Sequence, residues 1–456
     1  MTTPGSPPAS SSSARRCHNA ALGVSRQHLS RLVAQAGDQV LRIGKARATR
    51  YARTRSVEGL GRTLPVFRVC ESGDVVPDGR LHLLWGRQTY WDRGGTGDLF
   101  EGLPPVLVDM APQGYLGHGF AARFPELGLP PRLGDWTDDH RLLALARRGE
   151  DCVGDLIIGD ESFARYLATP TVSVEPTAYP DLARQSSTIP AGSSVGGERP
   201  KFGAFSRGRQ VLVKFAPAAD TATASRWRDL LWCEWKALQT IAAAGIPAAA
   251  ASCRDVGGWR FLEVDRFDRA GERGRRAVVS LFALNNEYVG GSNSWTAAVP
   301  ALQKAPFSLA DPDAARIRWL DVFGQLIANT DRHLGNMTFF LEAGNRIRLA
   351  PAYDFLPMFL APTAEVVVRR DPQPAPPSSS TLEVWSDAAQ WALRYWSELR
   401  SNPDLDEGVR TFAEESMTAI DALASRVAPT KVAAPLWRSG SSDIVAKKDG
   451  PVAASS

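Results

Sequence analysis

Short apolar runs separated by Gly and Pro mark two stretches of the chain as rich in β structure. The first begins near residue 60 and contains Leu64–Val69, Leu81–Trp85 and Pro105–Asp109. The second runs from Ser193 to Phe215, and Arg260–Phe267 follows as a further expected strand. We therefore predict an antiparallel β-rich segment in the first region and more strands in the second.

Helical periodicity appears between and after these stretches. Asp138–Arg148 predicts a helix capped by Thr137 or Asp138, and Ser225–Ala244 predicts a long helix. Thr169–Pro190 is typical of a loop or linker, whereas residues 271–428 are expected to be mostly helical apart from a hairpin around Asn345. Strand-rich blocks followed by helix-rich ones predict the α+β class.

These patterns divide the chain into six segments. In order they are a disordered leader (1–14), a small basic module (15–57), a β-rich segment (58–185), a second strand-containing segment (186–270), a helical segment (271–428) and a flexible tail (429–456).

The composition is that of an ordinary globular protein. The chain has 456 residues, of which 44% are hydrophobic and 22% charged. Its five scattered cysteines, without a C-x-x-C pair, fit neither a disulfide framework nor a zinc site and favour a reducing compartment. No apolar run approaches the roughly 20 residues of a membrane span, and the first residues lack the apolar core of a secretion signal. We therefore expect a cytoplasmic protein without a membrane partner.

Positive charge is concentrated at the start of the chain. Residues 1–57 hold ten Lys or Arg and one acid, in a chain whose net charge is only +4. A basic head on a mildly acidic body favours a polyanion such as DNA as the partner of the head, which would place the protein on the nucleoid when bound. The alternative is a solvated basic tail.

The basic head has the pattern of a helix-turn-helix. Gly23 suits the turn and Ser25 suits an N-cap, while Leu29, Leu32 and Val33 share one face that would dock on a preceding helix. The residues left facing outward, and predicted to contact DNA, are Arg26, Gln27, His28, Ser30 and Arg31.

A basic hairpin is expected directly after this helix. Gln39–Ile43 and Arg47–Tyr51 read as its strands, and Lys45 and Arg47 would meet phosphates like the wing of a winged helix. The segment therefore predicts a winged helix-turn-helix domain that binds DNA, and a homodimer would suit a palindromic operator. The alternative is a generic three-helix interaction module.

An Asp, an Asn five positions later and a second Asp after a short hairpin have the layout of a phosphoryl-transfer centre. Here these residues are Asp331, Asn336 and Asp354. Asp331 would orient a hydroxyl nucleophile as the catalytic base, while Asn336 and Asp354 would supply oxygen ligands to Mg²⁺. His333 lies between them and could orient the loop, although a structural hydrogen-bonding role is the alternative. For the whole set, the alternative is a polar surface turn.

Nucleotide-binding features precede this centre. Ser193–Lys201 is a Gly-containing loop whose backbone could approach a phosphate, and Lys214 lies in an apolar strand where burial without a partner would be costly. Glu234, in the middle of the long helix, is the best partner for Lys214, the alternative being a surface ion pair. The backbone of Val264–Arg269 could meet adenine. The predicted ATP contacts are Ser194, Val195, Gly196, Gly197, Glu198, Arg199, Lys201, Lys214, Glu234, Asp265, Arg266, Phe267, His333, Asn336 and Asp354.

Together these motifs resemble the HipA-like serine/threonine kinases over residues 60–425, and the fused helix-turn-helix resembles the YjjJ (HipH) branch. The resemblance implies a bilobal, protein-kinase-like fold with Mg²⁺ and ATP, in which residues 186–270 are the ATP-binding lobe and 271–428 the catalytic lobe. It implies Asp331 as catalytic base, Lys214 on the phosphates, and Ser194 as an autophosphorylated residue that switches the enzyme off.

The resemblance further implies a toxin-type kinase that phosphorylates a protein such as a translation factor. The loop here reads Gly197-Glu198-Arg199-Pro200-Lys201, where the family commonly has Gly-Ala-Gln-x-Lys. Two other function classes remain as alternatives: a DNA-binding regulator with a non-catalytic kinase-fold scaffold, and a Mg²⁺-dependent nuclease. Intact Asp331, Asn336, Asp354 and Lys214 argue against the first, and the phosphate loop and strand lysine argue against the second.

Overall fold

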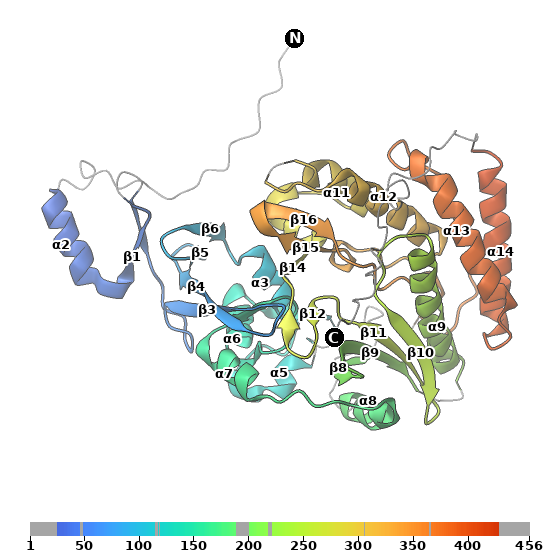
Figure 1. The fold of residues 1–456 in the computed structure, drawn as a ribbon, viewed down its shortest axis with the longest axis horizontal. Helices are drawn as coiled ribbons and strands as arrows, with labels where there is room; N and C mark the ends of the chain where they lie inside the picture. Colours follow the sequence, from blue (N-terminus) through green and yellow to red (C-terminus); the bar gives the residue numbers. More distant parts are fainter. Residues whose placement is uncertain are drawn as a thin grey trace, which may run out of the picture.

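The computed structural model describes residues 25–427 except 46–48, 115, 116, 118, 188–199, 218–220, 305, 364 and 365 (Figure 1). The predicted leader, the first helix of the basic head and the predicted tail therefore lie outside the described residues. Among the helices that are described, none is long and apolar enough to cross a membrane.

The basic head contains one described helix and a hairpin, which lie at one end of the molecule (Figure 1). Helix α2 (Arg26–Ala36) begins at Ser25, whose Oγ accepts a hydrogen bond from the His28 N–H. After a 3₁₀ turn η1 (Gly37–Gln39), strands β1 (Val40–Ile43) and β2 (Arg50–Arg53) pair antiparallel. The predicted capped helix and hairpin are thus present, while the winged helix-turn-helix as a whole stays a prediction.

The next segment is built on a five-stranded antiparallel sheet of order β6-β5-β4-β3-β7. Its strands are β3 (Thr63–Val69), β4 (Val75–Leu83), β5 (Gln88–Asp92), β6 (Gly97–Glu101) and β7 (Leu156–Ile158). Its helices are α3 (Pro105–Met110), α5 (Phe120–Arg123), α6 (Asp138–Arg148) and α7 (Asp160–Ala168), with 3₁₀ turns η3 (Pro125–Leu127) and η4 (Leu133–Asp135).

Two predictions for this segment have opposite outcomes. Helix α6 has the predicted bounds and is capped by Thr137, which forms a reciprocal capping box with His140. The prediction of a strand at Pro105–Asp109 is wrong. Pro105 instead begins helix α3, at a position where its missing N–H costs no hydrogen bond.

The following segment carries a four-stranded antiparallel sheet of order β10-β11-β9-β8. Its strands are β8 (Lys201–Ser206), β9 (Arg209–Ala216), β10 (Ala251–Val256) and β11 (Trp259–Asp265), and its long helix is α9 (Ala222–Ala243), close to the predicted bounds. Helix α8 (Tyr179–Ser187), preceded by the 3₁₀ turn η5 (Pro176–Ala178), packs on the face of the sheet that carries Val213 and Phe215. The prediction of Thr169–Pro190 as a loop is therefore wrong over α8, where Tyr179 and Ala183, one helical turn apart, are buried.

The C-terminal segment is mostly helical, as predicted, and contains the largest core. Four tryptophans, Trp295, Trp319, Trp385 and Trp396, are fully buried there. Its helices are α10 (Leu281–Leu284), the π-helical turn η6 (Asn285–Val289), α11 (Trp295–Leu302), α12 (Asp311–Leu326), α13 (Leu382–Ser401) and α14 (Glu407–Ala424). Its 3₁₀ turns are η7 (Leu334–Asn336), η8 (Ala343–Asn345) and η9 (Met358–Leu360).

A three-stranded antiparallel sheet interrupts these helices. It has the order β14-β15-β16, with strands β14 (Val278–Ser280), β15 (Thr338–Glu342) and β16 (Arg346–Leu349). The last two form the predicted hairpin around Asn345. Strands β12 (Arg269–Ala270) and β13 (Gly274–Arg275) lie in the connection from β11 to β14. Glu342 and Arg346 pair at the end of the hairpin, so that the chain returns from β16 toward Asp354.

Candidate active site between the two lobes

Lys214 and Glu234 form a buried ion pair. The alternation of β9 places Val213 and Phe215 toward α8, so Lys214 points to the opposite face, where α9 packs. Lys214 Nζ donates to Glu234 Oε1 at 2.6 Å, with the two residues only 5% and 1% exposed. Burial raises the pKa of Glu234 and the positive charge of Lys214 lowers it in part. The predicted Lys–Glu pair is therefore present in the geometry, and the surface-pair alternative for Glu234 is wrong.

The same lysine reaches Asp354 from the C-terminal lobe. Lys214 Nζ also contacts Asp354 Oδ1, which joins β9 to the segment after β16. Burial alone would raise the pKa of Asp354, but Lys214 and then Lys201 lower it below its ordinary value. Burial likewise opposes the charge of Lys214, yet the two carboxylates raise the pKa of the lysine. Asp354 is thus held as a carboxylate, and Lys214 as a cation, at the point where the lobes meet.

The loop that carries Asp331 is organised by Asn329, a residue to which the sequence patterns assigned no role. Helix α12 ends at Leu326, and Ala328 adopts the left-handed region with φ 56° before the loop begins. Asn329 is 1% exposed. Its Nδ2 donates to the backbone carbonyl of Asp354 at 3.3 Å, and its Oδ1 accepts from the Asp331 N–H at 3.0 Å. One side chain therefore ties both predicted acidic residues together through their backbones.

Asn336 closes the same loop from its other end. Its Nδ2 donates to the Asp331 carbonyl at 2.8 Å, which directs the amide nitrogen into the loop. Its Oδ1 is then the atom suited to a hard cation, and the Asp354 carboxylate would be the second oxygen ligand. An amide oxygen and a carboxylate fit Mg²⁺, so these two predicted residues could hold it. Among the described residues, no group of three or more His, Cys, Asp or Glu is placed to hold a metal.

The Asp331 and His333 side chains lie at the open side of the loop. Their side chains are 51% and 59% exposed, and His333 Nε2 is 4.0 Å from Asp331 Oδ1. His333 Nδ1 accepts from the Gly335 N–H at 3.1 Å, and the His333 carbonyl accepts from Trp295 Nε1 at 3.0 Å. This geometry favours a loop-orienting role for His333, while the exposed Asp331 carboxylate is accessible to an incoming hydroxyl group.

The comparisons with known proteins bear on this site. Residues 193–422 match the family model described as a HipA-like C-terminal domain, and residues 60–167 match the YjjJ-like toxin, middle domain. The chain is 33% identical over 435 residues to Toxin YjjJ of Escherichia coli (strain K12), covering 89% of this chain and 94% of that protein. The chain belongs to the HipA-like family, in its YjjJ branch.

Two solved structures are similar at lower levels. One is the HipA toxin of Shewanella oneidensis MR-1, solved with HipB and operator DNA, with 15% identity, a TM-score of 0.47, and coverage of 71% of this chain and 86% of that one. The other is the Helicobacter pylori proinflammatory kinase CtkA, with 15% identity, a TM-score of 0.36, and coverage of 49% and 90%.

In this HipA-like chain, the side chains of the segment predicted to contact adenine, Val264–Arg269, form contacts with other parts of the protein. Arg266 pairs with Asp151 and Asp268, and its backbone N–H donates to Gln210 at 2.9 Å. The Asp265 carboxylate accepts from Arg209 at 2.5 Å, and the Phe267 ring packs 5.5 Å from the ring of Tyr353. Contact of this segment with adenine therefore stays a prediction.

The remaining predicted site residues divide into three groups. Lys201 lies opposite Lys214 in the β8–β9 register. The phosphate-loop residues Ser194, Val195, Gly196, Gly197, Glu198 and Arg199 lie outside the described residues, as do Arg47 and the side chain of Arg26. The other predicted DNA contacts, Gln27, His28, Ser30, Arg31 and Lys45, are exposed.

Proposed function

We propose that this chain is an ATP- and Mg²⁺-dependent protein serine/threonine kinase of the toxin type. The observation that carries the proposal is the contact of one buried lysine, Lys214, with carboxylates of both lobes, Glu234 and Asp354. Phosphoryl transfer requires positioning and charge neutralisation rather than covalent chemistry from the protein. A lysine fixed by two carboxylates at the lobe junction is suited to orient the phosphates of a nucleotide.

The proposed roles follow from the loop geometry. Asp331 would accept the proton of the attacking hydroxyl, and Asn329 would hold Asp331 in position. Asn336 and Asp354 would hold Mg²⁺, which when bound neutralises charge on the phosphates. The resemblance to the HipA-like kinases, not the geometry, supports the segment from Gly196 to Lys201 as the phosphate contact and Ser194 as the autophosphorylated residue.

The acceptor that we propose is a serine or threonine of a protein, with a translation factor as one candidate. We propose also that the basic head binds DNA. The exposure of Gln27, His28, Ser30 and Arg31 on α2, beside a basic hairpin, supports this, since these side chains are free to meet a DNA groove.

The deciding experiment incubates the full chain with γ-labelled ATP and Mg²⁺. The wild type and Asp421→Asn, a control at an exposed position on α14, should incorporate label into protein, whereas Asp331→Asn should not. Bound ATP without label in any variant would favour the non-catalytic regulator. Plasmid cleavage that needs no ATP and survives Asp331→Asn would favour a nuclease.

A further inference from the structure

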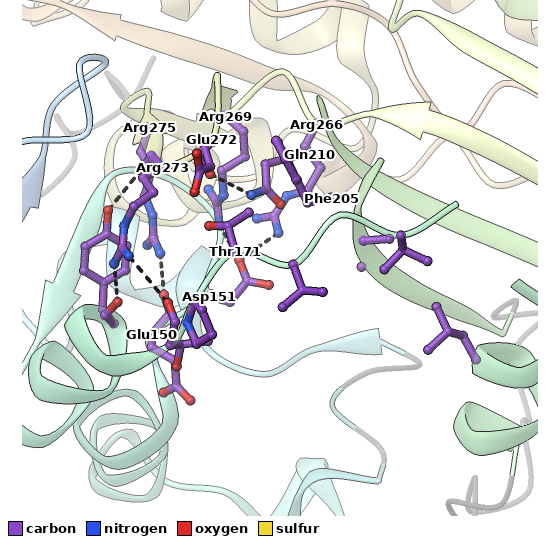
Figure 2. A pocket seen from close by; sticks show the side chains of 18 residues that line it. Glu150, Asp151, Thr171, Phe205, Gln210, Arg266, Arg269, Glu272, Arg273 and Arg275 are labelled. Atoms are coloured by element: carbon purple, nitrogen blue, oxygen red, sulfur yellow. Dashed lines mark hydrogen bonds and ion pairs between the residues drawn. The ribbon is translucent and has the colours of Figure 1, made fainter. Parts of the chain in front are cut away.

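A cavity of about 310 Å³ lies where three segments of the chain meet, and four arginines line it (Figure 2). One part of the lining comes from the chain between α6 and β8, which includes Glu150, Asp151 and the connection from α7 to α8. Strands β8 and β9 form the second part, and the connection from β11 to β14 forms the third. Its lining includes none of Lys214, Glu234, Asp331 or Asp354. The cavity is therefore separate from the Lys214–Asp354 centre and shares only Arg266 with the predicted ATP contacts.

Two of the four arginines are neutralised by neighbouring carboxylates. Arg266 donates to Asp151 at 3.0 Å and to Asp268 at 3.1 Å, and Arg269 donates to the same two acids at 2.9 Å and 2.5 Å. Figure 2 shows both guanidinium groups beside Asp151. The two positive charges are balanced by the two negative charges. This network therefore needs no ligand, and it links the segment after α6 to the segment after β11.

The other two arginines have no such balance. Arg273 donates to the backbone carbonyls of Tyr166 and Thr169, and Arg275 donates to the carbonyl of Glu150. Both guanidinium groups lie over the Tyr166 ring, 4.5 Å and 4.9 Å from its centroid. Within the described part of the chain, neither forms an ion pair with a carboxylate.

Arg275 is the more informative of the two. It is only 4% exposed, and its Nη1 has no hydrogen-bond partner among the described residues. Leaving a buried charged donor unsatisfied is costly, and burial lowers the pKa of Arg275 to about 10. Because Arg275 lines the cavity, an anion bound there would stabilise the charge of its guanidinium group.

The acids that also line the cavity are poor candidates for that anion. Asp151 is committed to Arg266 and Arg269, and Glu272 is exposed. Burial raises the pKa of Glu150, which disfavours its charged form, and no contact joins its carboxylate to Arg273 or Arg275 among the described residues. We therefore expect a bound ligand, and not one of these acids, to supply the negative charge that balances Arg273 and Arg275.

We propose that this cavity binds a phosphate group, held by Arg273 and Arg275. Planar guanidinium groups match phosphate oxygens with paired, charge-assisted hydrogen bonds. The volume lies at the lower end of the range for small-molecule sites, which suits a small phosphate-bearing ligand rather than a large one. Because the proposal concerns a second site, it does not depend on the proposed kinase activity.

The test measures binding of inorganic phosphate to the full chain by calorimetry and by thermal unfolding, with chloride at matched ionic strength. Wild type should bind and be stabilised, whereas Arg273→Gln and Arg275→Gln should bind about tenfold more weakly or not at all. Arg346→Gln, at an arginine whose side chain is 66% exposed, is the matched control and should behave as wild type. If Arg275→Gln fails to fold, Arg273→Gln decides, because Arg273 is only partly buried.

A second arm separates this cavity from the nucleotide site and identifies the phosphate source. Phosphate binding should persist in Lys214→Met, and its loss there with retention in Arg273→Gln would overturn the proposal. A short phosphoserine peptide, compared with its unphosphorylated form, tests whether the phosphate is presented on a protein. Binding of either probe that requires Arg273 supports the site, and binding of neither probe would overturn it.

Discussion

Asn329 is hydrogen-bonded to the backbone of Asp354, from Nδ2 to the carbonyl oxygen at 3.3 Å, across 25 positions of sequence. The same side chain accepts from the Asp331 N–H. Because Asp354 adopts a left-handed backbone with φ 56°, it needs such support to keep its carboxylate directed at Lys214. Asn329 therefore fixes the distance between the proposed base and the proposed metal ligand.

The first prediction follows from this contact. Asn329→Ala should lower the rate of phosphoryl transfer by about 100-fold, because small misplacements of reacting groups cost that much. Asn402→Ala is the control, since Asn402 makes the equivalent bond to the Asp404 N–H at an exposed position. Rates from labelled ATP and melting temperatures would be compared. Equal rates in the two variants, at equal stability, would remove Asn329 from the proposed mechanism.

The second prediction concerns the buried pair of Lys214 and Glu234. Lys214→Met should abolish use of ATP and also lower the free energy of unfolding by roughly 3–5 kcal/mol, because it leaves a buried carboxylate without a partner. The double variant Lys214→Met with Glu234→Leu should recover the part of the stability that the unpaired Glu234 carboxylate costs, but not the part due to Asp354, and none of the activity. Denaturant unfolding and nucleotide binding would be measured on both proteins. Full ATP turnover in either variant would show that the lysine has no role in nucleotide binding.

The spacing of the central motif could be predicted from sequence because its parts are local. Helix α12, the loop to Asn336 and the β15–β16 hairpin are each continuous in the chain, so their order alone indicates that Asp331 and Asp354 converge. The Lys214–Glu234 pair was also predictable, since a lysine in an apolar strand requires a partner.

What could not be predicted depends on contacts between distant segments. The role of Asn329 arises from its bond to Asp354, and Arg266, expected at adenine, is held by Asp151 from the segment before it. Helix α8 was missed because its buried positions, Tyr179 and Ala183, become apolar contacts only against the β8–β9 sheet. Tertiary contacts of this kind leave little local signal.

The third prediction tests the basic head. Arg31→Ala should weaken DNA binding on all sequences and lower the slope of log affinity against log salt by about one, if Arg31 contacts phosphate. Arg346→Ala, on the β15–β16 hairpin, is the control. Gel shifts at several salt concentrations would measure this. A loss confined to one operator sequence would instead assign Arg31 to base contacts, and an unchanged shift would contradict the recognition-helix interpretation.

The fourth prediction uses Asp109, which joins the YjjJ-like middle domain to the HipA-like domain. Its carboxylate accepts from the Ser280 N–H and Oγ–H, both at 2.6 Å. Burial raises the pKa of Asp109 from 3.8 to about 6, although the two Ser280 hydrogen bonds oppose the shift. The folded state therefore holds more protons than the unfolded state between these two values, and Asp109 makes the free energy of unfolding fall as pH rises through this window.

Asp109→Asn has no such titration, so its free energy of unfolding should rise relative to that of the wild type between pH 4 and pH 6. The two proteins would be compared by denaturant unfolding across this range, with Asp421→Asn as a surface control. The difference in free energy of unfolding, variant minus wild type, should increase steadily as pH rises. A flat difference curve would mean that Asp109 titrates alike in both states, and that its contact with Ser280 does not stabilise the junction in a pH-dependent way.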